Sequence, residues 1–457
     1  MSSSSAKDQN TQDILSKSMW QLMLKLTPPG IIGMSVNAIN TFVDAVYVGQ
    51  LINQDALAAI SLVFPLLLVT GAFSVMIGVG SSSLLSRAIG ANNLKVVEQV
   101  FGNLNALSLI LTVMIAIPSY LFAEELIAFL GGNESVIAYG TVYYRVLILG
   151  TFFRIYAIAT NMLIRAEGAL KEAMTYAGVN AVVNMIFCPV FILIFDMGIA
   201  GAAWATNLAM FVYTLLNIRF FSKGKGAYSA KWKSIALKHE ILPDVLSVGG
   251  SAMLLQLMFF VQQTVVFKSV AYYGNEMDIA FMGAVYRIVM LTVVPIFGFV
   301  QALQPVIGIN FGAEQYNRVR EAFIKFTAGA SLLMTIFWLP LILFPEYTLS
   351  IILPDATLGT SYIFNFRVMM VLLPILPVYF CGISFYQSIG EGKLASIVLL
   401  SRQVILFIPV VIILPLYIGI SGIYLSAPIV DLFLILVLCV LLAGRLSRLN
   451  MIKPATI

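Results

Sequence analysis

The chain has 457 residues, of which 60% are hydrophobic and only 10% are charged. A soluble globular protein has about 45–50% apolar and about 25% charged residues, so this composition excludes a water-exposed surface over most of the chain. The formal net charge of +5 does not indicate a nucleic-acid partner, because the basic residues are distributed in step with the apolar runs. We therefore expect an integral membrane protein whose partner is the lipid bilayer.

Apolar runs of about 20 residues or more recur along the chain, which is the length that an α-helix needs to cross about 30 Å of hydrocarbon. Backbone polar groups must be satisfied within the bilayer, and the runs lack the alternation of barrel strands, so each run is predicted to be helical. The twelve predicted spans are 22–51, 57–86, 97–121, 137–163, 174–195, 199–221, 243–271, 279–310, 318–345, 357–386, 394–418 and 421–446.

Lysine and arginine, including Arg87, Arg165 and Arg402, fall on one side of this predicted topology. The connecting loops of the other side carry acids instead, such as Asp55 and Asp196. The positive-inside rule then places both termini in the cytoplasm. The polar first residues do not have the pattern of a cleaved signal peptide. We expect a multi-pass protein of the cell membrane (inner or plasma membrane).

The two halves of the sequence repeat each other. Sliding the second half over the first by 222 residues superimposes Gly90 on Gly312 and Gly168 on Gly390, at matched topological positions. Because each half has an even number of spans, both copies insert in the same orientation, as in several secondary transporters. The alternative is a chance recurrence of glycine in a glycine-rich membrane protein.

The fold prediction is thus an all-α membrane protein of two six-helix lobes related by a parallel pseudo-two-fold axis. The predicted parts are a cytoplasmic tail over 1–21, an N-lobe over 22–221, a cytoplasmic linker over 222–242, a C-lobe over 243–446 and a cytoplasmic tail over 447–457.

Asp44 is a functional candidate because a charge at bilayer depth costs a few kcal/mol and needs a reason to be there. Asn180 and Asn184 lie one turn apart on one face of the fifth span, and Thr206 reaches a similar depth from the sixth span. A carboxylate, two amides and a hydroxyl can take up a proton or help to coordinate Na⁺. The plainer alternative is that they only hydrogen-bond neighbouring helices.

The C-lobe has one acid at bilayer depth, Asp431. Arg367 and Asp431 both lie about ten residues from the outer ends of their spans, so we predict a buried, structural ion pair. Pro28 and Pro29 interrupt the first span and are a candidate hinge. Five further polar residues are candidates for lining a substrate cavity: Arg154, Gln256, Gln262, Tyr286 and Arg287.

Several functions are disfavoured. No Gly-x-x-x-x-Gly-Lys-Ser/Thr loop is present, so the chain is not its own ATP motor. Three cysteines in apolar runs and one loop histidine do not indicate a metal site. Convergent catalytic groups at one depth are also missing, so we do not expect an enzyme or a cofactor.

The segment Asn40–Gly49, reading NTFVDAVYVG, resembles the first helix of the multidrug and toxic compound extrusion (MATE) family. Arg165–Gly168 and Gly201–Thr206 strengthen the resemblance, which covers essentially the whole chain. It implies a V-shaped bundle and alternating access driven by H⁺ or Na⁺, and places the chain in the prokaryotic branch whose coupling aspartate is in the first helix. It also implies that Asp44 is the coupling carboxylate, Asn184 its amide partner and Thr206 the hydroxyl, with Asn180 as a neighbour.

One position departs from the family pattern. Members often have Asp-Pro in the fifth span, where this chain has Cys188 before Pro189. Loss of a hard anionic ligand weakens Na⁺ binding more than protonation of Asp44. We therefore favour H⁺ over Na⁺ as the coupling ion.

The predicted function is secondary active export of a small, amphipathic substrate, as a multidrug antiporter that functions as a monomer. One alternative is a flippase for a lipid-linked precursor or an exporter of one dedicated metabolite. An alternative of another class is a membrane scaffold that transports nothing.

Overall fold

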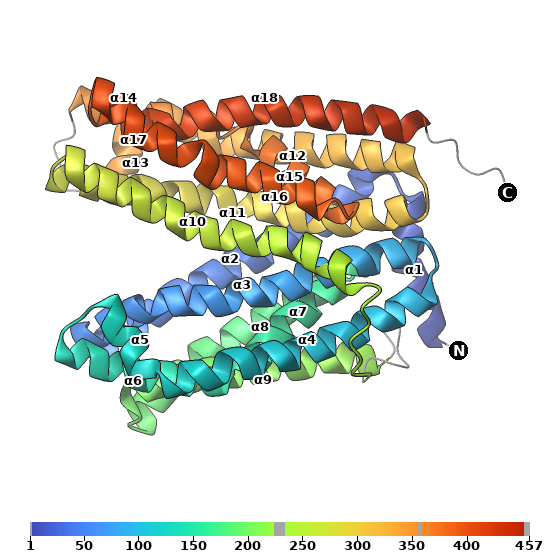
Figure 1. Cartoon of the computed structure of the whole chain (residues 1–457), viewed down its shortest axis with the longest axis horizontal. Helices are drawn as coiled ribbons and strands as arrows, with labels where there is room; N and C mark the ends of the chain where they lie inside the picture. Colours follow the sequence, from blue (N-terminus) through green and yellow to red (C-terminus); the bar gives the residue numbers. More distant parts are fainter. Residues whose placement is uncertain (1, 224–233, 354–358, 452–457) are drawn as a thin grey trace.

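A computed structural model describes residues 2–223, 234–353 and 359–451, and for residues 2–8 and 449–451 it describes the backbone only. Parts of the predicted linker and of the predicted C-terminal tail lie outside these residues. Every regular element within them is helical, and Figure 1 shows their arrangement. The elements are α1 (Ser2–Ser16), α2 (Met19–Leu51), α3 (Gln54–Gly90), α4 (Leu94–Leu121), α5 (Ala123–Leu130), α6 (Glu134–Leu149), α7 (Thr151–Ala166), α8 (Leu170–Pro189), the π-helical η1 (Val190–Ile194), α9 (Gly198–Ser222), α10 (Leu242–Tyr273), α11 (Glu276–Gly312), α12 (Tyr316–Leu343), α13 (Pro345–Ser350), α14 (Thr360–Met370), α15 (Leu376–Ser388), α16 (Gly392–Leu400), the π-helical η2 (Ser401–Ile405), α17 (Phe407–Ile418) and α18 (Ser421–Met451).

These elements account for the twelve predicted spans. Within the described residues, ten segments are long and apolar enough to cross a bilayer, and α6 with α7 makes an eleventh that is bent by 56°. The twelfth is divided into α14 and α15, and the break between them contains Pro374, which cannot continue a helical hydrogen-bond ladder. The predicted all-α, two-lobed membrane fold is confirmed.

The first 21 residues are not an irregular tail. They contain α1 and the start of α2, which Ser18 caps by accepting a hydrogen bond from the backbone N–H of Gln21. Ile14 is 2% exposed, and the Arg318 guanidinium donates to its carbonyl oxygen at 2.8 Å. The N-terminal segment therefore packs against the helical bundle, and Figure 1 shows both termini at the same end of it.

The two halves of the chain meet through crossed helix pairs, in which α2 packs against α11 and α3 against α10. Close approach is made possible by glycine. A Cβ on Gly30 of α2 would lie 2.8 Å from the carbonyl oxygen of Gly298 in α11, so these backbones are in direct contact. α2 continues through Pro28 and Pro29 without a break, so their role as a hinge stays a prediction.

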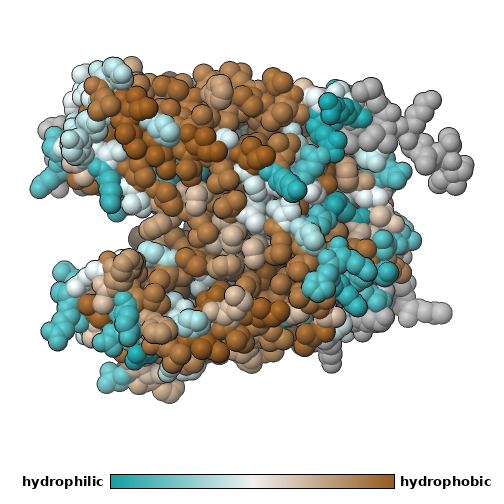
Figure 2. All heavy atoms as spheres, viewed as in Figure 1, coloured by the Kyte–Doolittle hydropathy of each residue, from teal (hydrophilic) through white to brown (hydrophobic). Residues whose placement is uncertain are grey.

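The buried side chains explain why the bundle is V-shaped. One apolar cluster, near the termini, contains residues of both halves, such as Leu85 and Ile307. At the other end the clusters separate, with Val63 and Ile192 in a cluster of the first half and Val285 and Tyr424 in a cluster of the second. Figure 2 shows the resulting opening between the halves, opposite the termini, and the apolar side chains that cover most of the face in view.

Candidate functional site

Asp44 lies in the C-terminal half of α2, in the lobe formed by the first six spans. It is partly buried, and Asn184 of α8 is 2% exposed beside it. In the amide orientation that satisfies both ends of its side chain, Asn184 donates to the two carboxylate oxygens of Asp44 at 2.6 and 3.1 Å and to Asn40 Oδ1 at 3.0 Å. Its oxygen then accepts from the Thr206 hydroxyl at 3.2 Å. Three predicted site residues are therefore brought together, with Asn40 as an addition.

Small residues of α9 allow Thr206 to approach Asn184 of α8. A Cβ on Gly201 of α9 would lie 2.8 Å from the backbone carbon of Phe191 in η1, so α9 and the end of the α8 span are in close contact. Ala202 and Ala205, which flank this contact, are buried. The short side chains bring Thr206 within hydrogen-bonding distance of Asn184, as in other close helix pairs in membranes.

Asn180 lies one turn before Asn184 and is 8% exposed. Its side-chain oxygen has no hydrogen-bond partner, and no hydrogen bond joins it to Asp44. Among the described residues it is therefore the predicted site member that lies beside the cluster without being part of it. An unpartnered buried amide oxygen can accept a hydrogen bond from a group that enters the lobe.

Cys188 occupies the next turn of α8, is 1% exposed and lies in the neighbourhood of Asp44. Tyr143 of α6 is buried in the same region, in the neighbourhood of Asp44, Cys188 and Arg154. The sequence did not single out Tyr143, because tyrosine in an apolar span is usually a packing residue. Within the described residues no group of three acidic, histidine or cysteine side chains is placed to hold a metal ion.

The predicted Arg367–Asp431 ion pair is wrong. Asp431 of α18 pairs with Arg402 of η2, which donates to its two carboxylate oxygens at 2.7 and 2.9 Å. The Arg402 guanidinium also lies 4.8 Å from the ring centre of Tyr379, a cation–π contact. Arg367 is exposed and donates to the carbonyl oxygen of Ile342 at 3.2 Å.

The physical reason is that counting residues from helix ends assumes straight helices. The tenth span breaks after Met370, so Arg367 lies in α14, the helix before the break. In the eleventh span Arg402 lies inside the π-helical turn η2, well within the span and not at the cytoplasmic boundary where the loop charges placed it. Asp431 is the nearest acid that the C-lobe offers at that level.

The structure does not gather the five cavity candidates at one place. Gln256 of α10 lies between the lobes, since a Cβ on Gly71 of α3 would lie 3.0 Å from its amide nitrogen. Tyr286 stacks on Phe267 and interacts electrostatically with Arg402 and Asp431. The other three are Arg154 near Tyr143, Gln262 at 7% exposure, and Arg287, which is exposed.

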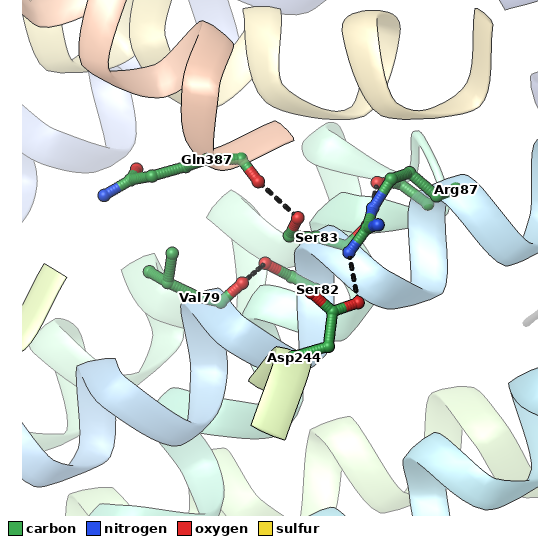
Figure 3. Close-up of polar contacts among 7 residues, drawn as sticks. Val79, Ser82, Ser83, Arg87, Asp244 and Gln387 are labelled. Carbon is green, nitrogen blue, oxygen red and sulfur yellow. Dashed lines mark hydrogen bonds and ion pairs between the residues drawn. The ribbon is translucent and has the colours of Figure 1, made fainter. Parts of the chain in front are cut away.

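The lobes are joined by polar contacts near the termini, which Figure 3 draws. An Arg87 nitrogen lies 2.8 Å from a carboxylate oxygen of Asp244, and the Ser83 hydroxyl donates to the carbonyl oxygen of Gln387. Ser83 and Arg87 belong to α3 of the first half, whereas Asp244 and Gln387 belong to α10 and α15 of the second. The bundle is thus closed at this end and open at the other.

The model of the MatE family matches residues 29–190 and again residues 251–413, one match in each lobe. The chain belongs to the MATE family. Two matches to one family model agree with the internal repeat in the sequence. MATE proteins are transporters and not enzymes, as the sequence predicted.

Other MATE proteins resemble this chain over nearly its whole length. The multidrug export protein MepA of Staphylococcus aureus is 24% identical over 422 residues, which are 91% of this chain and 92% of MepA. A crystal structure of MATE in the bent conformation superimposes with a TM-score of 0.90 at 26% identity, covering 97% of this chain and 98% of that one. An outward-facing multidrug resistance MATE transporter of the MOP superfamily superimposes with a TM-score of 0.86 at 26% identity, covering 96% and 98%.

Proposed function

We propose that this MATE protein is a secondary active multidrug exporter, an antiporter that exchanges a small amphipathic substrate for an inward-moving cation, with H⁺ favoured over Na⁺. The observation that carries the proposal is the single carboxylate of Asp44, held by Asn184 in one lobe of a bundle whose lobes separate at one end. The name of the relative MepA and the outward-facing transporter of similar fold support the export function.

Hydrogen bonding in the cluster explains how a proton would act. Asn184 donates to both oxygens of Asp44, an arrangement that suits an ionised carboxylate. A protonated carboxyl has an O–H that must itself donate, so one of these hydrogen bonds is lost and Asn40 or another acceptor takes its place. Protonation therefore changes the contacts between α2 and α8. It can drive transport because its free energy differs between the two conformations.

The side chains around Asp44 favour H⁺ over Na⁺. A hard cation such as Na⁺ prefers several oxygen ligands, and the soft sulfur of Cys188 stands where the family often has a second carboxylate. A proton needs only one carboxylate oxygen.

In the proposed cycle the substrate enters between the lobes from the cytoplasm or the inner leaflet, with both termini of the chain in the cytoplasm. Protonation of Asp44 from outside then rearranges α2 and releases the substrate through the open end. The protein works in the cell membrane as a monomer, and it needs no cofactor besides the coupling ion.

The test compares wild type, Asp44→Asn and Glu124→Gln in liposomes. Glu124 is an exposed acid of the same lobe and serves as the matched control. Flux of a fluorescent organic cation is measured under an imposed pH gradient and then under a Na⁺ gradient, at fixed membrane potential. We expect the pH gradient to drive flux in wild type and Glu124→Gln, and Asp44→Asn to fall to the level of empty liposomes.

The other outcomes separate the alternatives. If only the Na⁺ gradient drives flux, the coupling ion is Na⁺ and not H⁺. If neither gradient moves any organic cation, a flippase or an exporter of one dedicated metabolite becomes the better reading, and lipid and metabolite profiling would follow. A protein that moves no solute under any gradient would be a scaffold.

A further inference from the structure

We propose that Arg87 is a positioning residue of the transport cycle: with Ser83, Asp244 and Gln387 it forms an inter-lobe latch that holds the cytoplasmic end closed and opens once per cycle. The inference rests on the proposed function, because only a protein with two access states needs such a latch. It goes further in naming the side chains whose contacts set the balance between the two states.

The latch joins three helices of the two lobes (Figure 3). The Arg87 guanidinium, which also donates to the Ser83 carbonyl oxygen at 3.3 Å, reaches from α3 to Asp244 at the start of α10. One turn away, the Ser83 hydroxyl donates to the backbone of Gln387 in α15, whose amide donates to Ser251 of α10 at 2.9 Å. The side chains of Ser83 and Arg87 on α3 thus both contact the C-lobe.

The guanidinium of Arg87 is held on a third side by the loop before α16. Gly390 has φ +87 and lies directly against the guanidinium, with no room for a Cβ between them. The side chains of Arg87 and Asp244 are 19% and 34% exposed, so the ion pair is shielded from water on most of its surface. A partly buried ion pair contributes more than a fully exposed one, yet water can replace its contacts when the lobes separate.

Backbone contacts around the latch follow the internal repeat, but the ion pair does not. Gly90 lies against the carbonyl oxygen of Ile309, and Gly312 lies against that of Arg87. Gly312 and Ile309 are the repeat equivalents of Gly90 and Arg87, 222 residues further along the chain. Each glycine therefore makes the same contact with the opposite half, and the contact is made twice. The position equivalent to Arg87 in the second half is Ile309, which cannot form an ion pair. The Arg87 ion pair therefore has no counterpart at the equivalent position.

Because the ion pair has no second copy, no equivalent contact can compensate for its loss. The Arg87–Asp244 and Ser83–Gln387 contacts both cross from the first half of the chain to the second, so an inward-open conformation has to break them together. Apolar and glycine contacts remain on both sides of the axis when Arg87 is changed. Removing the ion pair should therefore shift the balance between conformations without dismantling the bundle.

The experiment measures the separation of the lobes directly. Spin labels are placed at Lys95→Cys in α4 and Arg320→Cys in α12, which are exposed positions on different lobes near the latch, after replacement of Cys188, Cys381 and Cys439. Double electron–electron resonance then gives the distribution of distances in lipid nanodiscs. We expect Arg87→Gln to increase the ratio of the longer to the shorter distance about fivefold, the factor that corresponds to about 1 kcal/mol.

Arg445→Gln is the matched control. Arg445 forms an ion pair with Glu391, and both side chains are 31% exposed, but both residues lie in the C-lobe. This variant should leave the distance distribution unchanged. Asp244→Asn removes the same ion pair from the other lobe and keeps the test available if Arg87→Gln does not fold.

The double variant Arg87→Gln with Asp244→Asn should match either single variant, because one contact cannot be lost twice. Equal distributions in Arg87→Gln and Arg445→Gln, including the case in which neither gains the longer distance, would overturn the latch, and so would fully additive effects in the double variant. The distances are measured without an ion gradient. Failure of the latch is therefore distinguished from failure of the coupling role of Asp44.

Discussion

Asn184 is the residue on which the candidate site depends, because it contacts Asp44, Asn40 and Thr206 and is almost completely buried. Removing one partner of a buried polar group leaves the others unsatisfied, at a cost of about 1–3 kcal/mol. The buried Asn180 has an unpartnered oxygen and offers a comparison of the same residue type, one turn away.

We expect Asn184→Ala to lower the melting temperature by several degrees and gradient-driven flux by at least about tenfold, since Asp44 loses the donor that orients it. Thermal unfolding in detergent and liposome flux are the measurements. Asn180→Ala should change both quantities less. Equal losses in the two variants would mean that Asn184 has no special relation to Asp44.

Cys188 allows the choice of coupling ion to be reversed. Cys188→Asp adds a hard carboxylate one turn from Asn184, and two acids with amide and hydroxyl oxygens are a better Na⁺ site than one. We expect this variant to gain flux driven by a Na⁺ gradient, whereas Cys188→Ala should remain driven by the pH gradient alone. A Cys188→Asp variant that transports well but ignores Na⁺ would show that the second acid is not what selects the ion.

The sequence predicted that Asp44, Asn184 and Thr206 lie together, because polar residues in an apolar span stand out against their neighbours, and the structure brings these three side chains together. The sequence did not identify Tyr143, because a tyrosine in an apolar span is usually a packing residue, and only the arrangement of α6 places it in the neighbourhood of Asp44. Arg402 was assigned to the wrong level for a related reason. Its charge was visible in the sequence, but the π-helical turn that holds it was not.

At the scale of helices, the sequence predicted where spans lie better than where they bend. Long apolar runs give the spans within a few residues. The 56° bend between α6 and α7 occurs at Gly150, which packs against Asn207 of α9, and the break before α15 includes Pro374. Glycine and proline are common in membrane helices, so their presence alone does not tell which one interrupts a helix.

The corrected C-lobe ion pair gives a prediction for two arginines. Breaking a buried ion pair by removing one partner costs about 3–5 kcal/mol, whereas an exposed arginine contributes little. Arg402→Ala should therefore lower the melting temperature much more than Arg367→Ala, with thermal unfolding as the measurement. A larger fall in melting temperature in Arg367→Ala than in Arg402→Ala would contradict the Arg402–Asp431 pairing and favour the Arg367–Asp431 pair that the sequence predicted.

The docking of α1 has a pH dependence with a defined sign. The ammonium groups of Lys17 and Lys25, each 2.8 Å from the Asp13 carboxylate, hold the pKa of that carboxyl below its usual range. A lowered pKa in the folded state means that the contribution to stability is present above the unfolded value of about 3.9 and is lost as the pH falls through the folded value.

We therefore expect α1 to stay docked between pH 5 and pH 8. Amide exchange of residues 9–17, corrected for the intrinsic rate, should not change over this range, and should rise only below about pH 4. Asp13→Asn is the control, since it removes the titrating group. Release of the segment near pH 6 in the wild type would show that another group controls its docking.

At the scale of the whole molecule, the lobes share an apolar core near the termini and have separate cores at the open end. The repeat and the even number of spans in each half predicted two lobes. Which end is closed could not be predicted, because both access states have the same sequence and differ only in which contacts are made.

The mutual contact of Gly90 and Gly312 with the backbone of the opposite helix has a consequence for how such a protein can change over generations. Where a side chain fills a gap, a smaller neighbour can make room for a larger one. Here each glycine faces a carbonyl oxygen, which every amino acid has, so no substitution elsewhere can compensate for the loss of either glycine. The two copies of the repeat differ at Asp44 and Arg87, which are paired with Val266 and Ile309, but at this crossing each copy limits which residues the other can have.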